Sequence, residues 1–192
     1  YLKEIKEIIS KSTFTYVRQK QMLGLGNAIL TGEPLIGDEP FAVLLADDLC
    51  DCDNNGVLAQ LIKIHDKYQC SVVAIEEVPM NKTNQYGIIS GNLIDNSNNT
   101  YLVTDMIEKP EEKDAPTNIA IIGRYILTPD IFDILRNIKP DKNGEIQITN
   151  ALMIQAKQGK VLAYRFKGKR FDCGSVKGFL EATNHFANKL GI

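Results

Sequence analysis

Two consecutive acidic side chains stand at the carboxyl end of a segment predicted to be a strand, which is where open α/β sheets bind ligands, and a third stands where the last helix is predicted to open. Asp47 and Asp48 follow the apolar run FAVLLA, and Asp172 lies in RFDCG. Adjacent strand residues point to opposite faces, so Asp47 and Asp48 are not expected to bind one ion together. One of them, joined by a carboxylate from elsewhere, suits Mg²⁺, which takes a few carboxylates and keeps water and substrate oxygens in its shell. The alternative is that both are solvated loop acids that cap the next helix.

The segment MIEKPEE contains a second pair of groups that could act together. Pro110 favours an extended conformation at Lys109, so Glu108 and Lys109 should end a strand with their side chains pointing different ways. The carboxylate could accept hydrogen bonds from sugar hydroxyls, and the cation could bind a phosphate. In isolation E-K-P is also a common turn, and Asp172 is equally typical of a helix N-cap.

The segment GLGNAI resembles part of a dinucleotide-binding turn. That turn needs a third glycine where this chain has Ile29, although Asp47 could serve as the acidic residue about twenty positions later. The residues QKQM also separate Gly24 from the preceding predicted strand, whereas the dinucleotide turn follows its strand directly. We therefore interpret Gly24 and Gly26 as packing positions at a helix start.

Histidine and cysteine indicate no further chemistry. His65 and His185 fall in predicted amphipathic helices without a Ser or Cys partner pattern, so we expect packing or surface roles. Cys50 and Cys52 flank Asp51, but two thiolates without further clustered Cys or His make a poor zinc site. We expect reduced thiols instead.

Composition indicates one α/β domain over residues 1–192, since 44% of the 192 residues are hydrophobic. Lys plus Arg (22) nearly balance Asp plus Glu (24), which disfavours nucleic-acid binding. No run reaches the length of a membrane-spanning helix, and no charged-then-apolar leader stands at the start. We expect a cytoplasmic protein that binds neither nucleic acid nor membrane.

The elements that must position these groups alternate between strand and helix. Periodicity and β-branched content predict strands over 13–19, 41–47, 70–78, 118–127 and 160–168, with the second buried on both faces. Helices are predicted over 1–11, 26–33, 57–68, 129–138, 146–158 and 176–190, with Asn54 or Asn55 capping the third and Thr128 the fourth. Short extended pieces occupy 86–108, with a hairpin turn at NSNN. This rhythm predicts a mostly parallel sheet.

Taken in order, VRQ, GLGNA, DEPFAVLLADD, YGII, MIEKP, NIAIIGRYIL, GEIQIT and FDCG resemble the bacterial UTP:glucose-1-phosphate uridylyltransferase family over essentially the whole chain. The resemblance implies a Mg²⁺-dependent nucleotidyltransferase that forms UDP-glucose and pyrophosphate from UTP and glucose 1-phosphate. It implies a Rossmann-like three-layer α/β/α fold with a central mixed sheet and a small accessory β region, which would fit the change of rhythm at residue 86. Members of the family are commonly homodimers or homotetramers.

The same resemblance implies roles for residues on the nucleotide side. Gln19 matches the position that reads the uracil edge, and Gly24 matches the glycine whose backbone lies against the base. Asp47 and Asp172 match the two Mg²⁺ ligands, and Asp48 is expected to bind substrate beside them.

On the sugar side, the resemblance places Gly87, Glu108 and Lys109 around glucose 1-phosphate, with Glu108 on sugar hydroxyls and Lys109 on the phosphate. We expect Lys109, Asp47 and Asp172 to carry catalysis by positioning and by neutralising charge.

The family's glycine-rich phosphate loop, followed by Arg and later Lys, is missing from the sequence. The family carries it upstream of the helix in which Tyr1 stands, so we expect an amino-terminally truncated domain with little turnover alone. Two alternatives stay open: a non-catalytic homologue or fragment that binds a nucleotide-sugar, and a related pyrophosphorylase that uses dTTP.

Overall fold

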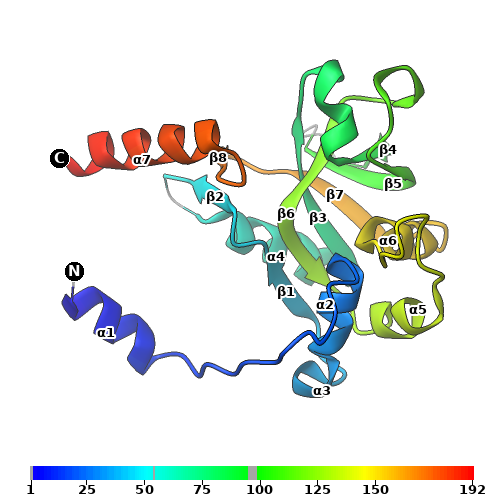
Figure 1. Cartoon of the computed structure of the whole chain (residues 1–192), viewed down its shortest axis with the longest axis horizontal. Helices are drawn as coiled ribbons and strands as arrows, with labels where there is room; N and C mark the ends of the chain where they lie inside the picture. Colours follow the sequence, from blue (N-terminus) through cyan, green and yellow to red (C-terminus); the bar gives the residue numbers. More distant parts are fainter. Residues whose placement is uncertain (1, 54, 95–98) are drawn as a thin grey trace.

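A six-stranded sheet organises the molecule, whose computed structural model describes residues 2–53, 55–94 and 99–192 (Figure 1). The strand order is β1-β6-β3-β7-β5-β4. The strands are β1 (Phe41–Leu44), β3 (Ser71–Glu77), β4 (Gly87–Leu93), β5 (Thr100–Glu108), β6 (Ile119–Leu127) and β7 (Val161–Arg165).

The sheet is mixed, and the prediction that it would be mostly parallel is wrong. Only the β3–β7 pair is parallel among the described strands. Strands β1 and β3, which flank the helix α4 (Val57–Tyr68), do run in the same direction. They are not neighbours, because β6 lies between them and pairs antiparallel with both.

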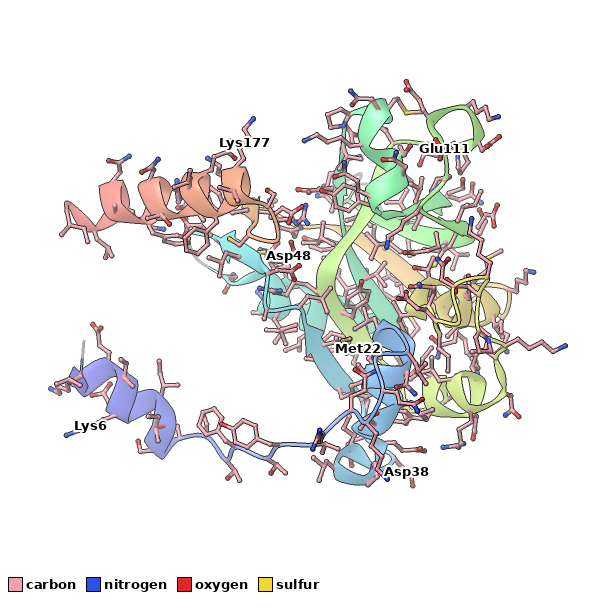
Figure 2. All side chains as sticks on the ribbon, in the orientation of Figure 1. Lys6, Met22, Asp38, Asp48, Glu111 and Lys177 are labelled. Carbon is pink, nitrogen blue, oxygen red and sulfur yellow. The ribbon has the colours of Figure 1, made fainter. Side chains whose placement is uncertain are left out.

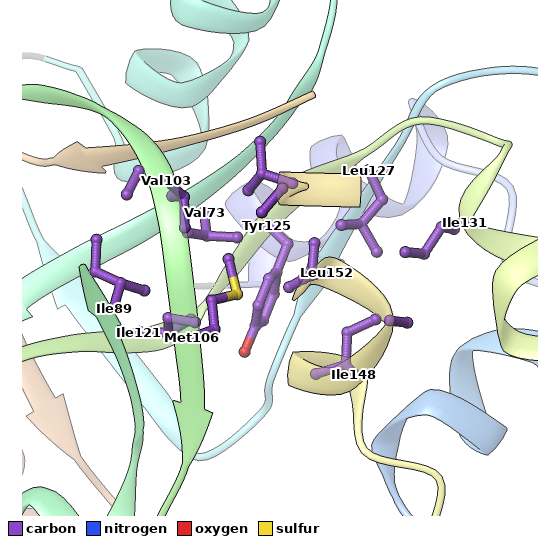
Figure 3. Close-up of a cluster of buried hydrophobic side chains, with 14 of the residues drawn as sticks. Val73, Ile89, Val103, Met106, Ile121, Tyr125, Leu127, Ile131, Ile148 and Leu152 are labelled. Atoms are coloured by element: carbon purple, nitrogen blue, oxygen red, sulfur yellow. The ribbon is translucent and has the colours of Figure 1, made fainter. Parts of the chain in front are cut away.

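Helices cover both faces of this sheet, so the predicted three-layer α/β/α arrangement is confirmed. On one face α4 packs Val57 and Leu61 against Val72 and Ala74 of β3. The other face carries α2 (Leu25–Thr31), α5 (Ile131–Asn137) and α6 (Ile148–Ala156). Figure 3 shows part of the core between these helices and the sheet. Successive β3 residues point into alternate clusters, which is the pattern of a strand buried on both faces.

A separate two-stranded sheet is formed by β2 (Asp48–Asp51) and β8 (Lys169–Asp172), and the helix α7 (Val176–Leu190) follows it. This pair is the small accessory β region. The segment 86–108, where the change of rhythm suggested that region, instead belongs to the central sheet, because β4 pairs with β6 and β5 with β7.

Two predicted strands differ from the structure. Residues 13–18 are exposed and residues 13–19 form no strand, because nothing among the described residues pairs with them. The preceding helix α1 (Leu2–Ser10) buries none of its residues. Strand β1 ends at Leu44 and alternates in burial, with Leu44 54% exposed, so it is not buried on both faces.

Helix starts also differ from prediction. Helix α4 begins after Gly56 without a side-chain cap, and Asn54 lies outside the described residues. Helix α5 begins at Ile131 after Asp130, because the Thr128 hydroxyl is used by Ser71 and Gln155 in a buried polar cluster. The NSNN turn lies mainly outside the described residues. The remaining short helices are α3 (Glu33–Ile36) and the 3-10 turns Met80–Gln85 and Glu112–Asp114.

Candidate active site

The structure brings Asp47 and Asp172 together at the start of the β2–β8 pair. The Cys173 main-chain N–H donates to the Asp47 carbonyl oxygen at 2.7 Å. Gly174 lies between the two carboxylates, because a Cβ placed there would stand 3.2 Å from both Asp47 Oδ2 and Asp172 Oδ1. The two oxygens are therefore no farther apart than twice that distance, and a side chain at 174 would fill the space that they share.

This donor set fits Mg²⁺, because Mg²⁺ is bound through one or two carboxylates while water and substrate phosphates complete its octahedron. No cluster of three or more His, Cys, Asp or Glu side chains that could hold a metal occurs in the described part of the chain. A pair of carboxylates is consequently suited to an ion that arrives with phosphate ligands, and poorly suited to a fully protein-coordinated ion.

Asp48, labelled in Figure 2, is the first residue of β2, and its carboxylate has partners inside the protein. Its side chain is buried, and its Oδ2 accepts from the Gly123 main-chain N–H at 2.5 Å. Its Oδ1 accepts from Arg170 Nε, also at 2.5 Å. This geometry does not favour the expected contact of Asp48 with substrate. Both oxygens of its carboxylate already accept hydrogen bonds, from Gly123 and from Arg170.

Arg170 and Tyr86 are polar residues of the site that no motif assigned. Arg170 is 8% exposed and also binds Glu76 at 2.7 Å. Burial opposes its charge, but the hydrogen bond to Tyr86 and the negative charge of Asp48 raise the pKa of Arg170 further above its usual value. Its guanidinium is a permanent positive charge among these carboxylates.

The sugar-side residues meet where β4 pairs with β5. Gly87 stands opposite Glu108, whose Oε2 accepts from Thr149 Oγ1 at 2.6 Å. A Cβ at position 87 would lie 2.9 Å from Thr149 Oγ1 and 3.3 Å from Glu108 Oε2, so only glycine leaves this carboxylate open. Thr149, from α6, was not predicted from sequence.

Lys109 projects its ammonium to within 3.8 Å of Glu108 Oε1, with its side chain 55% exposed. Its φ is 47°, so the extended conformation predicted from Pro110 is wrong. A hydrogen bond from the Lys109 N–H to the Tyr86 carbonyl oxygen, at 3.0 Å, accompanies this turn. The Lys109 ammonium is exposed and lies beside the Glu108 carboxylate. A phosphate bound by Lys109 and a sugar bound by Glu108 would therefore be neighbours.

Gln19 and Gly24 are also neighbours. Gln19 Nε2 donates to Asn27 Oδ1 at 2.8 Å and to the Gly24 carbonyl oxygen at 3.4 Å. Gly24 has a φ of 87°, and a Cβ there would lie 2.9 Å from the Ile146 carbonyl oxygen. The Gly26 N–H donates to that same oxygen at 2.8 Å. These glycines let α2 approach the chain before α6, which supports the packing interpretation of GLGNAI.

Tyr125 is a further residue that the motifs did not single out. It is buried on β6, and Figure 3 shows its side chain among the apolar residues of the core. Burial raises the pKa of Tyr125, and the negative charges of Glu108, Asp48 and Asp47 raise it further. The two groups of residues are joined by hydrogen bonds at Tyr86, whose hydroxyl donates to Asp172 Oδ2 and whose carbonyl oxygen accepts from the Lys109 N–H.

Other polar features lie apart from this region. A cavity of about 650 Å³ is lined by residues that include Asp51, Lys63 and His185, and by none of the predicted site residues. His185 Nε2 lies 2.7 Å from Asp51 Oδ2, and His65 Nδ1 lies 2.7 Å from the Cys70 carbonyl oxygen, so both histidines have hydrogen-bond partners. All four cysteines are free thiols.

None of the helices in the described ranges is both long and apolar enough to span a membrane.

Known proteins resemble this chain closely. It is 58% identical over 185 residues to a UTP–glucose-1-phosphate uridylyltransferase of Pseudomonas aeruginosa, covering 96% of this chain and 66% of that protein. It is 42% identical to UTP–glucose-1-phosphate uridylyltransferase 2 of Staphylococcus saprophyticus, covering 98% of this chain and 64% of that protein. The chain thus spans slightly under two thirds of the length of these relatives.

Solved structures agree. A UDP-glucose pyrophosphorylase crystallised with UDP-glucose superposes with a TM-score of 0.94 at 58% identity, over 98% of this chain and 71% of that one. A UTP-bound enzyme of the same type from Acinetobacter baumannii gives a TM-score of 0.81 at 31% identity, over 98% and 67%. The model of the nucleotidyl transferase family matches residues 1–189. The chain therefore belongs to the nucleotidyl transferase family.

Proposed function

We propose that the protein transfers a uridylyl group from UTP to glucose 1-phosphate, forming UDP-glucose and pyrophosphate. The observation that carries the proposal is the convergence of Asp47 with Asp172 beside Gly174, in the region that also holds Glu108 and Lys109. The first pair suits a Mg²⁺ ion with phosphate ligands, and the second suits a sugar phosphate. Relatives that bear the uridylyltransferase name at 58% identity support the choice of substrates.

In the proposed reaction, a phosphate oxygen of glucose 1-phosphate attacks the α-phosphorus of UTP. A new P–O bond forms, the bond between the α-phosphorus and the bridging oxygen breaks, and pyrophosphate leaves with that oxygen. The attacking oxygen is already ionised, so no protein base is required, and the residues act by positioning and charge neutralisation. This accounts for a site without a histidine.

Each predicted residue has a place in this scheme. Lys109 offsets the negative charge of the attacking phosphate, and Glu108, held by Thr149, accepts hydrogen bonds from sugar hydroxyls. Asp47 and Asp172 would hold Mg²⁺, which supplies a Lewis acid that neutralises charge on the phosphates.

On the nucleotide side, Gln19 offers its amide to the uracil edge while the backbone of Gly24 lies against the base. Asp48 acts by holding Arg170 and does not contact substrate. We propose a cytoplasmic homodimer or homotetramer, in line with the resemblance.

The test measures UDP-glucose from UTP, glucose 1-phosphate and Mg²⁺ by anion-exchange chromatography, in a protein that carries the upstream phosphate loop and in residues 1–192 alone, where we expect little turnover. We expect Lys109→Ala and Asp172→Asn to lower kcat by a factor on the order of 10²–10³. A Leu93→Ala variant, altered on an exposed end of β4, serves as the control with unchanged kcat. UDP-glucose binding by calorimetry without any turnover would favour a non-catalytic homologue or fragment. Preference for dTTP in competition would favour the related pyrophosphorylase.

A further inference from the structure

Tyr86 connects the metal side of the candidate site with its phosphate side. Its hydroxyl donates to Asp172 Oδ2 at 3.2 Å, and its carbonyl oxygen accepts from the Lys109 N–H at 3.0 Å. The next residue, Gly87, pairs with Glu108. One residue therefore contacts a proposed metal ligand through its side chain and the proposed phosphate ligand through its backbone.

The two oxygens of Asp172 have different surroundings. Oδ2 faces the protein, where it accepts from Tyr86 and lies 3.7 Å from Arg170 Nη2. Oδ1 accepts from the Gly174 N–H at 3.1 Å and borders the space that Asp47 also borders. A carboxylate is planar, so holding Oδ2 on the phenol fixes the direction in which Oδ1 points.

Arg170 in turn holds the phenol in place. Arg170 Nη1 donates to Tyr86 Oη at 3.4 Å, and Cζ lies 5.2 Å from the centre of the Tyr86 ring. The guanidinium cannot move freely, because Asp48 and Glu76 bind it and only 8% of its side chain is exposed.

We propose that Tyr86 is a positioning residue that aims Asp172 Oδ1 toward Asp47 and so sets the affinity of the site for a divalent cation. The inference rests on the proposed function. Residues that orient a metal ligand by hydrogen bonding change metal affinity about 10–100-fold when they are replaced. Tyr86→Phe removes only the hydroxyl and keeps the carbonyl that receives Lys109, so the phosphate side should be unaffected.

Tyr101→Phe provides a matched control. The Tyr101 hydroxyl also accepts from an arginine, Arg165 Nη2 at 3.2 Å, and the Arg165 guanidinium lies 6.0 Å from the ring centre. Tyr101 pairs with Leu93 and Ala163, at the opposite end of β5 from Glu108. The two variants therefore lose the same kind of phenol–guanidinium contact, and only one of the two phenols touches Asp172.

The experiment titrates Mn²⁺ into wild type, Asp172→Asn, Tyr86→Phe and Tyr101→Phe at saturating UDP-glucose, which supplies phosphate oxygens, and measures free Mn²⁺ by electron paramagnetic resonance. We expect the Kd for Mn²⁺ to rise about 10–100-fold in Tyr86→Phe and to stay unchanged in Tyr101→Phe. In turnover assays, half-saturation by Mg²⁺ should rise in Tyr86→Phe while KM for glucose 1-phosphate stays within about twofold.

The outcomes separate this inference from the proposed function. If Asp172→Asn loses Mn²⁺ but Tyr86→Phe keeps the wild-type Kd, the positioning role is overturned and the proposed function stands. If Tyr86→Phe and Tyr101→Phe weaken Mn²⁺ equally, the effect is general and the inference is likewise overturned. If Asp172→Asn binds Mn²⁺ as wild type does and still makes UDP-glucose, the metal role of Asp172 itself is wrong.

Discussion

Replacing Asp48 with asparagine should destabilise the protein far more than the same change at Asp47. Asp48 Oδ1 and Oδ2 each accept one strong hydrogen bond, from Arg170 and Gly123. Asparagine has one acceptor oxygen, so one buried donor would face its NH₂ group, which costs about 1–3 kcal/mol. Arg170 keeps Glu76 but loses a buried ionic partner, and breaking such pairs costs about 3–5 kcal/mol when no other partner remains. We expect a loss of about 3 kcal/mol in the free energy of unfolding.

Urea unfolding followed by circular dichroism measures this loss, without added Mg²⁺. For a chain of this size, about 3 kcal/mol corresponds to a fall in Tm of about 6–12 °C. Asp47→Asn alters an exposed carboxylate and should change the free energy of unfolding by no more than about 0.5 kcal/mol. The ranking should reverse in a Mn²⁺ titration, where Asp47→Asn loses affinity. Equal destabilisation by both variants, or a loss below about 1 kcal/mol for Asp48→Asn, would refute the reasoning.

Three further predictions concern the same region. Thr149→Val leaves Glu108 Oε2 without its donor at 2.6 Å, so KM for glucose 1-phosphate should rise about tenfold in steady-state assays while half-saturation by Mg²⁺ is unchanged. Gly178→Ala places a Cβ 1.8 Å from the Asp172 carbonyl oxygen, so α7 must shift, and urea unfolding should show a loss of about 1–3 kcal/mol. Burial raises the pKa of Cys50 from 9.0 to about 11, so alkylation by iodoacetamide at pH 8 should leave this thiol unmodified. The unfolded chain loses this proton first, so the stability that neutral Cys50 contributes is present below pH 9.0 and is lost as the pH rises to about 11.

Each of these predictions has a control. Thr149→Ser keeps the hydroxyl and should restore the wild-type KM, so a raised KM in that variant would contradict the hydrogen-bond explanation. Gly56→Ala adds a Cβ with nothing within 4 Å and should leave stability nearly unchanged, in contrast to Gly178→Ala. Rapid alkylation of Cys50 at pH 8, located by peptide mass spectrometry, would contradict its burial.

Local sequence patterns predicted individual elements well and their pairing poorly. The apolar spacing of 57–68 and 176–190 predicted α4 and α7 with correct bounds. Helix α4 turns one stripe of residues inward, whereas α7 leaves Val176, Phe179 and Leu180 exposed. The same reasoning predicted a mostly parallel sheet, which is wrong. The β-α-β spacing does not reveal that a later strand, β6, lies between β1 and β3. Residues 13–19 have strand composition, yet strand propensity reflects packing against a partner, and no described strand pairs with them.

The site was predictable to a similar extent. Strand alternation indicated that Asp47 and Asp48 diverge, but it could not say which of them faces solvent, because the pairing of Asp48 with Asp172 decides this. Tyr86 and Arg170 stood inside quoted motifs without being assigned any chemistry. Their importance comes from contacts between residues far apart in the sequence, and no single-sequence spacing rule contains such contacts.

The β2–β8 pair also has a consequence for how the molecule acquires its site during folding. Arg170 and Asp48 are 122 positions apart, so the pair closes a very long loop, and contacts of that separation tend to form slowly. During synthesis Asp47 emerges well before Asp172, and no cation can be held between them until β8 has joined β2. A divalent cation would then stabilise only the completed fold, by an amount set by its concentration relative to its Kd. Cation binding is thus a late step that stabilises the folded chain and cannot guide the chain toward the folded state.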